Sequence, residues 1–302
     1  MRISFSEDVN AERSGKHKFL SRLNAAFERS GHIHVGSSDK ADVHLMLPGG
    51  GRNKRAKVNI LRLDGLMLQS ADLGRNAKLA VQASGSDGVV YQGEFCRRAY
   101  QTVLGISQRY AVIPNGADPK EFLPRSPSGN ILANAKWRPH KRLDAICEGY
   151  SRARRNGFSG DLIITGTPER RIDGDGIRYI GWQDSSQLRS LLSSAAATVH
   201  LTWLDWCPNS MVESVVAGCP VVYTDSGGHT EIASGSGVSV SDRQWNFKLP
   251  LDHYHPPKLD LDEVAMAIIK AAKMGSVSNP ALSISVSCDR YVAFFESVLE
   301  TV

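Results

Sequence analysis

The stretch "CPNSMVESVVAGCPVVYTDSGGHTE" (207–231) contains one copy of the pattern that decides the fold. Residues 210–217 are typical of a short apolar helix, "PVVYT" (220–224) is typical of a buried strand, and two adjacent glycines lie in the loop that follows. A single carboxylate, Glu213, lies inside the apolar helix. A charged group in such a helix indicates either a cap for that helix or a contact with a ligand.

Strands alternate with amphipathic segments along the whole chain. Eleven runs are expected to form strands: "MRISFS", "HIHVG", "DVHLML", "KVNILRL", "GVVYQ", "RYAVIP", "NILANA", "DLIITG", "IRYIGW", "TVHLTW" and "PVVYT". Helices are expected at 16–29, 94–104, 141–156, 184–196, 210–217 and 289–299. One of these helices has a predicted capping box, in which Asp184 and Gln187 cap its start. The alternation predicts parallel sheets with helices on both faces.

A stretch rich in Pro, Gly and Ser near 114–129 separates the strands and helices into two series. The sequence therefore predicts an α/β fold with two Rossmann-like domains. The first is expected at 1–112 and the second at 113–285. A C-terminal helix in 286–302 can pack on either domain, including back on the first.

Composition narrows the class of protein. The chain has 302 residues, 41% of them hydrophobic, and no apolar run of the roughly 18 residues that span a bilayer. The start, "MRISFSEDVN", has no basic segment followed by an apolar one, so no signal peptide is expected. The five scattered cysteines form no CxxC, which favours reduced thiols over disulfides or a zinc site. We expect a cytoplasmic protein without a bound metal.

Positive charge is concentrated in the first part of the chain. Residues 1–112 contain 17 Lys and Arg against 10 Asp and Glu, a net charge of +7, and the remainder contains 19 against 21, a net charge of −2. The densest cluster is "GRNKRAK" (51–57). This asymmetry favours an anionic partner, either a phosphate-bearing substrate, a membrane surface or nucleic acid. For the cluster by itself, a solvated loop is the favoured interpretation.

Three loops of the second series follow strands and are therefore expected at the same edge of the sheet, where such proteins bind ligands. "AKWRPHK" (135–141) contains Lys136, Arg138 and Lys141. "LDWCPNS" (204–210) leads into a helix, whose first N–H groups attract anions. "DSGGHTE" (225–231) contains two glycines that allow the backbone to approach a ligand. The set suits a diphosphate.

Each of these residues also has a simpler interpretation. Ser210 and Glu213 have the spacing of a capping box, and on spacing alone this role is as well supported as ligand binding. Lys141 fits a solvated first-turn residue, Asp205 a loop carboxylate, and Gly227–Gly228 a turn. Only their joint position at one edge favours a binding site.

At these residues the chain resembles the retaining glycosyltransferases of the GT-B fold, family 4 (glycosyl transferase group 1). That family has two Glu separated by seven residues, then Gly-x-Pro-Val-Val and Gly-Gly-x-x-Glu. Here "GCPVV" (218–222) and "GGHTE" (227–231) match, with Asp205 and Glu213 at the two Glu positions. "ANAKWRPHKRLD" is similar to the family's Gly-Arg-Leu-x-x-x-Lys-Gly segment, with Lys136 at the Arg position. "YAVIPNGADPKEF" and "DGVVYQGEFCRRAY" resemble the segments around its interdomain strand.

The resemblance, over roughly 87–235, implies two Rossmann-like domains that face each other across a cleft. It implies that the second domain binds a nucleotide-diphosphate sugar. Lys136 and Lys141 would neutralise the diphosphate and Asp205 would bind the sugar ring. The remaining donor contacts would come from Glu213 to the ribose, the amides of Asn209 and Ser210 to the diphosphate, and the backbone near Gly181 and Trp182 to the base. Asp205 is shorter than Glu, and Lys136 is a point charge where the family has a bidentate Arg.

The implied reaction transfers a sugar to a hydroxyl acceptor with retention of configuration and without a metal or other cofactor. Two lysines and a helix N-terminus would stabilise the leaving diphosphate. The acceptor would be a glycan, a lipid-linked sugar or a small molecule. The basic first domain leaves open a peripheral contact with an anionic membrane.

The first domain is expected to hold the acceptor, with loops 6–18, 48–55 and 63–68 facing the cleft. Gly15 and Lys16 precede a helix and are expected to contact the diphosphate or the acceptor. Asp64 lies at a strand end, where a hydroxyl-binding or catalytic carboxylate would be useful. A charge pair between Arg62 and Asp64, or a turn, is favoured over catalysis for this residue.

Two other functions stay open at this point. A nucleotide-sugar epimerase on the same fold would use a similar donor site, although "VIPNG" and "GGHTE" favour a transferase. A nucleic-acid-binding protein would use the cluster at 51–57, but no aromatic residues alternate with its basic residues. A dinucleotide oxidoreductase is disfavoured because no GxGxxG follows a strand.

Overall fold

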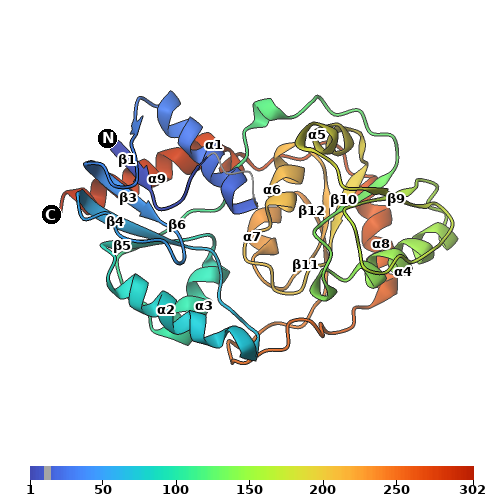
Figure 1. Ribbon diagram of the computed structural model, residues 1–302. Helices are drawn as coiled ribbons and strands as arrows, with labels where there is room; N and C mark the ends of the chain where they lie inside the picture. The colour runs from blue at the N-terminus through green and yellow to red at the C-terminus, as the bar shows by residue number, and fades with distance from the viewer. Residues whose placement is uncertain (10–14) are drawn as a thin grey trace. The chain divides into compact units, whose positions relative to one another are not determined.

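The computed structural model describes residues 1–9 and 15–302, which form two compact units (Figure 1). Unit 1 comprises Met1–Ala117, Phe247–Leu251 and Ala281–Val302. Unit 2 comprises Asp118–Asn246 and Asp252–Pro280. The limits expected at 112 and 285 stay a prediction. Residues 10–14 of the loop expected at 6–18 lie outside the described part of the chain.

In its described residues, unit 1 contains a six-stranded parallel sheet with the order β2-β1-β3-β4-β5-β6. The strands are β1 (Arg2–Phe5), β2 (Ile33–His34), β3 (Ala41–Met46), β4 (Ala56–Leu63), β5 (Gly88–Tyr91) and β6 (Tyr110–Val112). Strand β4 has the longest buried run, because six of its eight residues, Val58 to Leu63, are buried. All pairings are parallel, so the carboxyl ends of these strands lie at one edge.

Helices cover both faces of this sheet, α1 and α9 on one and α2 and α3 on the other (Figure 1). They are α1 (Gly15–Arg29), α2 (Leu73–Ser84), α3 (Glu94–Leu104) and α9 (Ile284–Leu299), with short 3₁₀ turns η1 (Ser70–Asp72) and η4 (Pro280–Leu282). The ring of Phe27 on α1 packs against Tyr291 and Phe295 on α9. The last helix of the chain is thus part of the core of unit 1.

Unit 2, all of whose residues are described, contains a second six-stranded parallel sheet with the order β12-β11-β10-β7-β8-β9. Its strands are β7 (Ile131–Asn134), β8 (Leu162–Thr165), β9 (Ile177–Gly181), β10 (Ala197–His200), β11 (Val221–Thr224) and β12 (Gly237–Val240). All eleven expected strands therefore form, and the sequence analysis missed β12. Its sequence, "GVSV", is short and contains a glycine, which weakens the strand signal.

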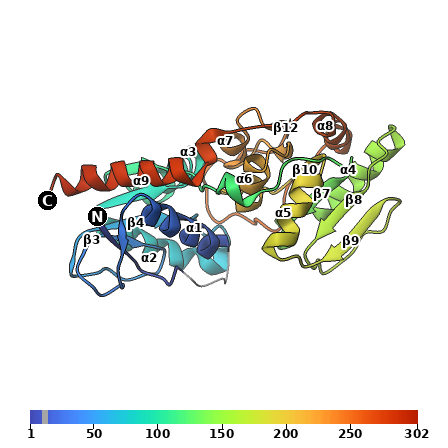
Figure 2. The same ribbon diagram turned by 90° about the horizontal axis from the view of Figure 1, so that it is seen from above.

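The helices of unit 2 are α4 (Leu143–Arg155), α5 (Ser185–Ser194), α6 (Asn209–Val216), α7 (His229–Ala233) and α8 (Leu261–Ala272), with 3₁₀ turns η2 (Pro119–Glu121) and η3 (Pro139–Lys141). Helices α4 and α8 lie side by side in both views and cover one face of the sheet (Figures 1 and 2). The capping box at α5 is confirmed, because Asp184 accepts from the Gln187 amide at 2.8 Å and Gln187 Oε1 accepts from the Asp184 amide at 2.9 Å.

The basic cluster at 51–57 occupies a different place from the one expected. No helix separates β3 from β4 in the described chain, so the loop between them runs from the carboxyl to the amino edge of the sheet. Arg55 O accepts from Ala41 N at 3.4 Å, which places the basic end of the loop beside the start of β3. Arg52 pairs with Asp87 and Lys57 with Asp42. The expectation that loop 48–55 as a whole lies at the ligand-binding edge is therefore wrong.

Over the described residues, no helix combines the length and the apolar character that crossing a bilayer requires. All five cysteines are buried and form no disulfide.

Candidate functional site

An ion pair joins two of the three predicted loops at the carboxyl edge of the unit 2 sheet. Lys141, at the end of η3 after β7, places Nζ 2.6 Å from Asp205 Oδ2, in the loop after β10. Oδ1 of Asp205 accepts from the Trp206 amide at 2.9 Å. The two side chains are 21% and 18% exposed. Lys141 is thus paired and half-buried, so the interpretation of a solvated first-turn residue is wrong.

The glycine loop after β11 packs against the backbone around Asp205. The Gly228 amide donates to Asp205 O at 2.8 Å. A Cβ on Gly227, whose φ is +75°, would lie 2.6 Å from Asp205 O, and one on Gly228 would lie 2.1 Å from Trp206 O. Both positions require glycine because the 204–206 backbone packs directly on them. Three loops therefore meet at Asp205, as the sequence predicts.

Helix α6 begins at the same edge, directly after Pro208. Pro208 provides no side-chain cap, and the Met211 and Val212 amides of the first turn donate to Pro208 O. Ser210 is the second residue of the helix, and its carbonyl accepts from Ser214 Oγ. The capping box of Ser210 with Glu213 therefore does not form. Glu213 is 5% exposed, inside the buried face of α6.

A small cavity places the first loop beside the start of α6. Its lining includes Ala135 and Lys141 from the loop after β7, His200 and Thr202 from the end of β10, and Ser210 from α6. Lys141 thus borders both the carboxylate of Asp205 and the N-terminus of a helix. This arrangement gathers positive charge and N–H donors around one point, which suits an oxyanion.

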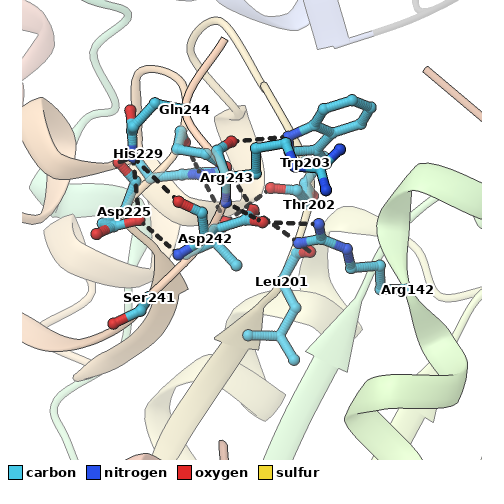
Figure 3. A network of polar contacts seen from close by, with 12 residues as sticks. Arg142, Leu201, Thr202, Trp203, Asp225, His229, Ser241, Asp242, Arg243 and Gln244 are labelled. Atoms are coloured by element: carbon cyan, nitrogen blue, oxygen red, sulfur yellow. Dashed lines mark hydrogen bonds and ion pairs between the residues drawn. The ribbon is translucent and has the colours of Figure 1, made fainter. Parts of the chain in front are cut away.

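A buried ion pair fixes the loop that carries Lys141. Arg142 forms a bidentate contact with Asp242, at 2.8 and 2.9 Å, and these side chains are 3% and 0% exposed (Figure 3). Arg142 also donates to Leu201 O, and Asp242 accepts from Ser226 Oγ at 2.6 Å. The network therefore connects the segments that follow β7, β10, β11 and β12.

Two residues beside the Lys141–Asp205 pair have a left-handed backbone. Arg142 has φ +53° and Leu204 has φ +55°, a conformation uncommon for residues other than glycine. Such conformations persist only where the surrounding contacts hold them, and they are concentrated at functional sites. The Arg142 side-chain contacts described above provide this restraint for the first loop.

Four histidines surround the pair, and each has a lowered pKa. Burial, with neighbouring positive charge, lowers the pKa of His140 and of His200 to about 3. Burial also lowers the pKa of His229 and of His253, whose ring stacks on that of His140 with a centroid distance of 4.2 Å. Burial by itself would raise the pKa of Asp205, but Lys141 and nearby positive charge hold it well below its usual range. At neutral pH the site therefore contains neutral imidazoles around a charged pair.

These histidines predict that unit 2 loses stability in acid. Their folded-state pKa lies below 6.5, so the unfolded chain binds more protons, and the free energy of unfolding falls as pH falls from about 6.5 towards about 3. Each histidine contributes a slope of up to about 1.4 kcal/mol per pH unit. All five tryptophans lie in unit 2, so urea unfolding followed by tryptophan fluorescence measures this slope.

His140→Phe keeps an aromatic ring in the stack. It should reduce the slope by the contribution of one histidine, up to about 1.4 kcal/mol per pH unit. His255→Gln, at a side chain that is 86% exposed, should leave the slope unchanged. An equal slope in the His140→Phe chain would contradict the interpretation.

The other predicted residues of unit 2 lie at the same edge of the sheet but apart from the pair. Lys136 is exposed and has no ion pair or hydrogen bond with any described residue. Gly181 ends the edge strand β9 with φ +73°, and its carbonyl accepts from the Gly166 amide at 2.8 Å. The side chain of Trp182 is 74% exposed. No contact joins either residue to Lys141 or Asp205 in the described chain.

The predicted residues of unit 1 lie at the carboxyl edge of its own sheet. Gly15 is the first described residue of α1, and Lys16 Nζ pairs with Glu7 at 2.6 Å. Asp64 follows β4 and forms the expected ion pair with Arg62. The interpretation of Asp64 as the ion-pair partner of Arg62 is therefore confirmed.

Sequence reasoning missed several residues of the site. Arg142 and Asp242 are 100 residues apart, and no local pattern connects them. Gly166 lies under the loop after β7, where a Cβ would be 2.5 Å from Ala135 O. The position of Gly166 directly after the strand "LIIT" is the one sequence signal that could have found it.

The sequence analysis overlooked two Asp-x-Asp sequences, at 173–175 and 260–262. Both sequences contain side chains that have partners within unit 2. Asp175 pairs with Arg154 at 2.5 Å, and Asp260 caps α8 by accepting from the amides of Asp262 and Glu263. No group of three or more metal-ligating side chains is found within residues 1–9 and 15–302.

Comparison with known families finds one match. Residues 130–246, from the start of β7 to the end of the Arg142–Asp242 network, match the model of the family described as Glycosyl transferases group 1. The matched segment therefore contains Lys141, Asp205, Glu213 and the glycine loop. No curated protein sequence matches the chain.

Solved structures with the same fold are numerous. A glycosyltransferase involved in avilamycin A biosynthesis superposes with a TM-score of 0.65 at 15% identity, covering 100% of this chain and 98% of its own. Sucrose-phosphate synthase from Thermosynechococcus elongatus gives 0.65 at 14%, covering 99% and 96%. HepE from Anabaena, in complex with UDP-glucose, gives 0.60 at 13%, covering 100% and 99%. The predicted α/β fold of two Rossmann-like units, GT-B, is confirmed.

Proposed function

We propose that the chain is a glycosyltransferase that moves a sugar from a nucleotide-diphosphate sugar, bound by unit 2, to a hydroxyl acceptor bound by unit 1. The observation that carries the proposal is the meeting of Lys141, the glycine loop and the start of α6 around Asp205. The family match over residues 130–246 covers these same residues and supports the proposal. The remaining steps follow the retaining enzymes of family 4.

In the proposed reaction the bond between the anomeric carbon and the diphosphate oxygen breaks, and its electron pair stays on the diphosphate. Lys141 and the amides of Asn209 and Ser210 stabilise the new negative charge, and Lys136, exposed on the same loop, adds to the positive potential. Each charge-assisted contact is worth about 1.5–3 kcal/mol. These groups supply the charge without a metal ion.

Asp205 has two roles in this proposal. Its carboxylate holds Lys141 in place through Oδ2, and its oxygens retain lone pairs that can accept from a sugar hydroxyl. Glu213 accepts from the ribose hydroxyls, and the backbone at Gly181 and Trp182 contacts the base. The acceptor oxygen attacks the anomeric carbon on the face the diphosphate leaves, which retains the configuration, and its proton passes to the departing phosphate oxygen.

A ligand screen tests the donor half of the proposal. The thermal unfolding midpoint is measured with UDP, GDP and ADP and with their glucose or mannose conjugates. UDP-glucose is tested first because the structural neighbour HepE binds it. We expect at least one nucleotide to raise the midpoint and its sugar conjugate to be cleaved. Isomerisation of the sugar without an acceptor would instead indicate an epimerase, and no nucleotide binding at all would contradict the proposal.

Replacing Glu213 by alanine is expected to weaken binding of the selected nucleotide by at least about tenfold, because a hydrogen bond to a charged group is lost. The measurement is isothermal titration with the nucleoside diphosphate. Ser210→Ala is the matched control, since it removes the hydroxyl that a capping box would need and keeps the backbone amide. Loss of stability in the Glu213→Ala chain with unchanged affinity would contradict a role of Glu213 in nucleotide binding.

A further inference from the structure

Asp64 is the centre of a cluster at the carboxyl edge of the unit 1 sheet. Its Oδ1 contacts Arg62 Nη1 and accepts from Gln92 Nε2 at 2.7 Å. Arg62 comes from β4, and Gln92 directly follows β5. The side chain of Asp64 is 27% exposed, whereas Arg62 is 1% exposed and Gln92 is 6% exposed. A buried layer therefore supports one partly exposed carboxylate.

The buried guanidinium is itself held from two further directions. Arg62 Nη2 donates to Asn115 Oδ1 at 2.6 Å, and the guanidinium lies 4.5 Å from the centre of the Phe19 ring. Asn115 follows β6 and Phe19 comes from α1. Burying a charged guanidinium is costly unless it is paired, so four elements cooperate to keep this group beneath Asp64. Such a cluster fixes the orientation of the carboxylate.

The contacts leave one oxygen of Asp64 available. Both contacts in the described chain use Oδ1, and Oδ2 accepts from none of the described residues. Because an ionised carboxylate accepts only, Oδ2 suits a ligand that donates a hydrogen bond. Arg62 and Asp64 are together neutral, and the exposed group is the negative one. A phosphate at this point would therefore be repelled, whereas a hydroxyl would be bound.

We propose that Asp64 binds a hydroxyl of a neutral sugar acceptor through Oδ2, and that Arg62 and Gln92 are positioning residues that hold the carboxylate through Oδ1. The inference rests on the proposed function and adds the class of acceptor at this subsite. It differs from the anionic acceptor that the basic charge of the first 112 residues favours, since the cluster at 51–57 extends to the opposite edge of the sheet.

The test uses the full chain with methyl α-glucoside and methyl α-mannoside as neutral probes and glycerol 3-phosphate as the anionic probe. Binding is measured by saturation-transfer-difference NMR titration. The variants are Asp64→Asn and Gln92→Leu. Asp72→Asn is the matched control, since Asp72 forms an exposed pair with Arg75 at 3.5 Å on the same unit. Affinity for the nucleoside diphosphate and the thermal midpoint are measured in every variant.

We expect the unchanged chain to bind at least one glycoside more tightly than glycerol 3-phosphate. Asp64→Asn should weaken that binding at least tenfold and Gln92→Leu about threefold or more, with nucleotide affinity unchanged in both. The Asp72→Asn chain should match the unchanged one. Gln92→Leu removes no charge, so its effect does not depend on leaving Arg62 unpaired.

Each other result contradicts the inference. Glycoside binding that is absent, weaker than that of glycerol 3-phosphate, or unaffected by both variants would overturn it. Those results leave the proposed function standing if the chain still binds the nucleotide. A different result, the absence of nucleotide binding by the unchanged chain, would overturn the proposed function.

Discussion

Replacing Lys141 by alanine is expected to slow cleavage of the nucleotide sugar by a factor of about 10²–10³, the usual effect of removing one donor that stabilises a developing oxyanion. Lys141 lies at the edge where α6 begins and is 21% exposed, so its charge acts in a site with little water. The measurement is the steady-state rate of nucleoside diphosphate release. Most of the loss should appear in kcat, because the charge develops as the bond breaks.

Two variants make this result specific. Lys270→Ala, at an exposed position of α8, should leave the rate unchanged. Lys136→Ala should slow the reaction less than Lys141→Ala, because an exposed charge is screened by water. A Lys141→Ala chain that is properly folded and cleaves the donor within threefold of the original rate would remove Lys141 from the proposed mechanism.

Lys141→Ala also leaves Asp205 without its ion-pair partner. The tryptophan fluorescence of unit 2 therefore has to be followed in the same samples, so that lost rate is distinguished from lost structure. Asp205→Asn in the Lys141→Ala background removes the uncompensated charge. If the single variant is less stable, this double variant should recover stability but not rate.

Arg142→Met is expected to lower the free energy of unfolding of unit 2 by about 3–5 kcal/mol, the cost of breaking a buried pair by removing one partner. Asp242 would remain fully buried, with only Ser226 Oγ and the Arg243 amide as donors. The loss of Arg142 also removes the restraint on its left-handed backbone. Urea unfolding followed by tryptophan fluorescence measures the change.

The matched control is Arg152→Met, which breaks the exposed pair with Asp262 and should have no measurable effect. The double variant Arg142→Met with Asp242→Asn should be more stable than Arg142→Met by itself, since the buried charge is gone. Equal stability of Arg142→Met and the original chain would show that the network does not hold these loops.

Much of the fold was predictable because its signals are local. Runs such as "KVNILRL" and "DLIITG" mark buried parallel strands, and the Asp184–Gln187 spacing marks the start of α5. The sequence analysis missed two longer helices, α2 and α8. Helix α8, "LDEVAMAIIKAA", has apolar residues at helical spacing and Asp260 as its cap, so it was readable from the sequence. The short helix α7 was not, because five residues are too few for a helical period to show, and β12 was not, because "GVSV" contains only two apolar residues.

Only those features of the site that follow from the order of strands in the sheet were predictable. Parallel strands bring Lys141, Asp205 and the glycine pair to one edge, and this follows from the strand pattern. The pairing of Arg142 with Asp242, the left-handed backbone at Arg142 and Leu204, and the gathering of four histidines depend on contacts between distant segments. Propensity disfavours a left-handed arginine, so no local rule could have indicated it.

The position of α9 determines when the first unit can be completed during synthesis. Its core needs Tyr291, Phe294 and Phe295, which are made only after the whole of unit 2. The parallel sheet of unit 1 must therefore wait, with the part of its face that α9 covers still exposed, while the whole of unit 2 is made. A nonsense mutation in the codons for residues 284–299 would accordingly damage a sheet whose strands are all encoded before unit 2 begins.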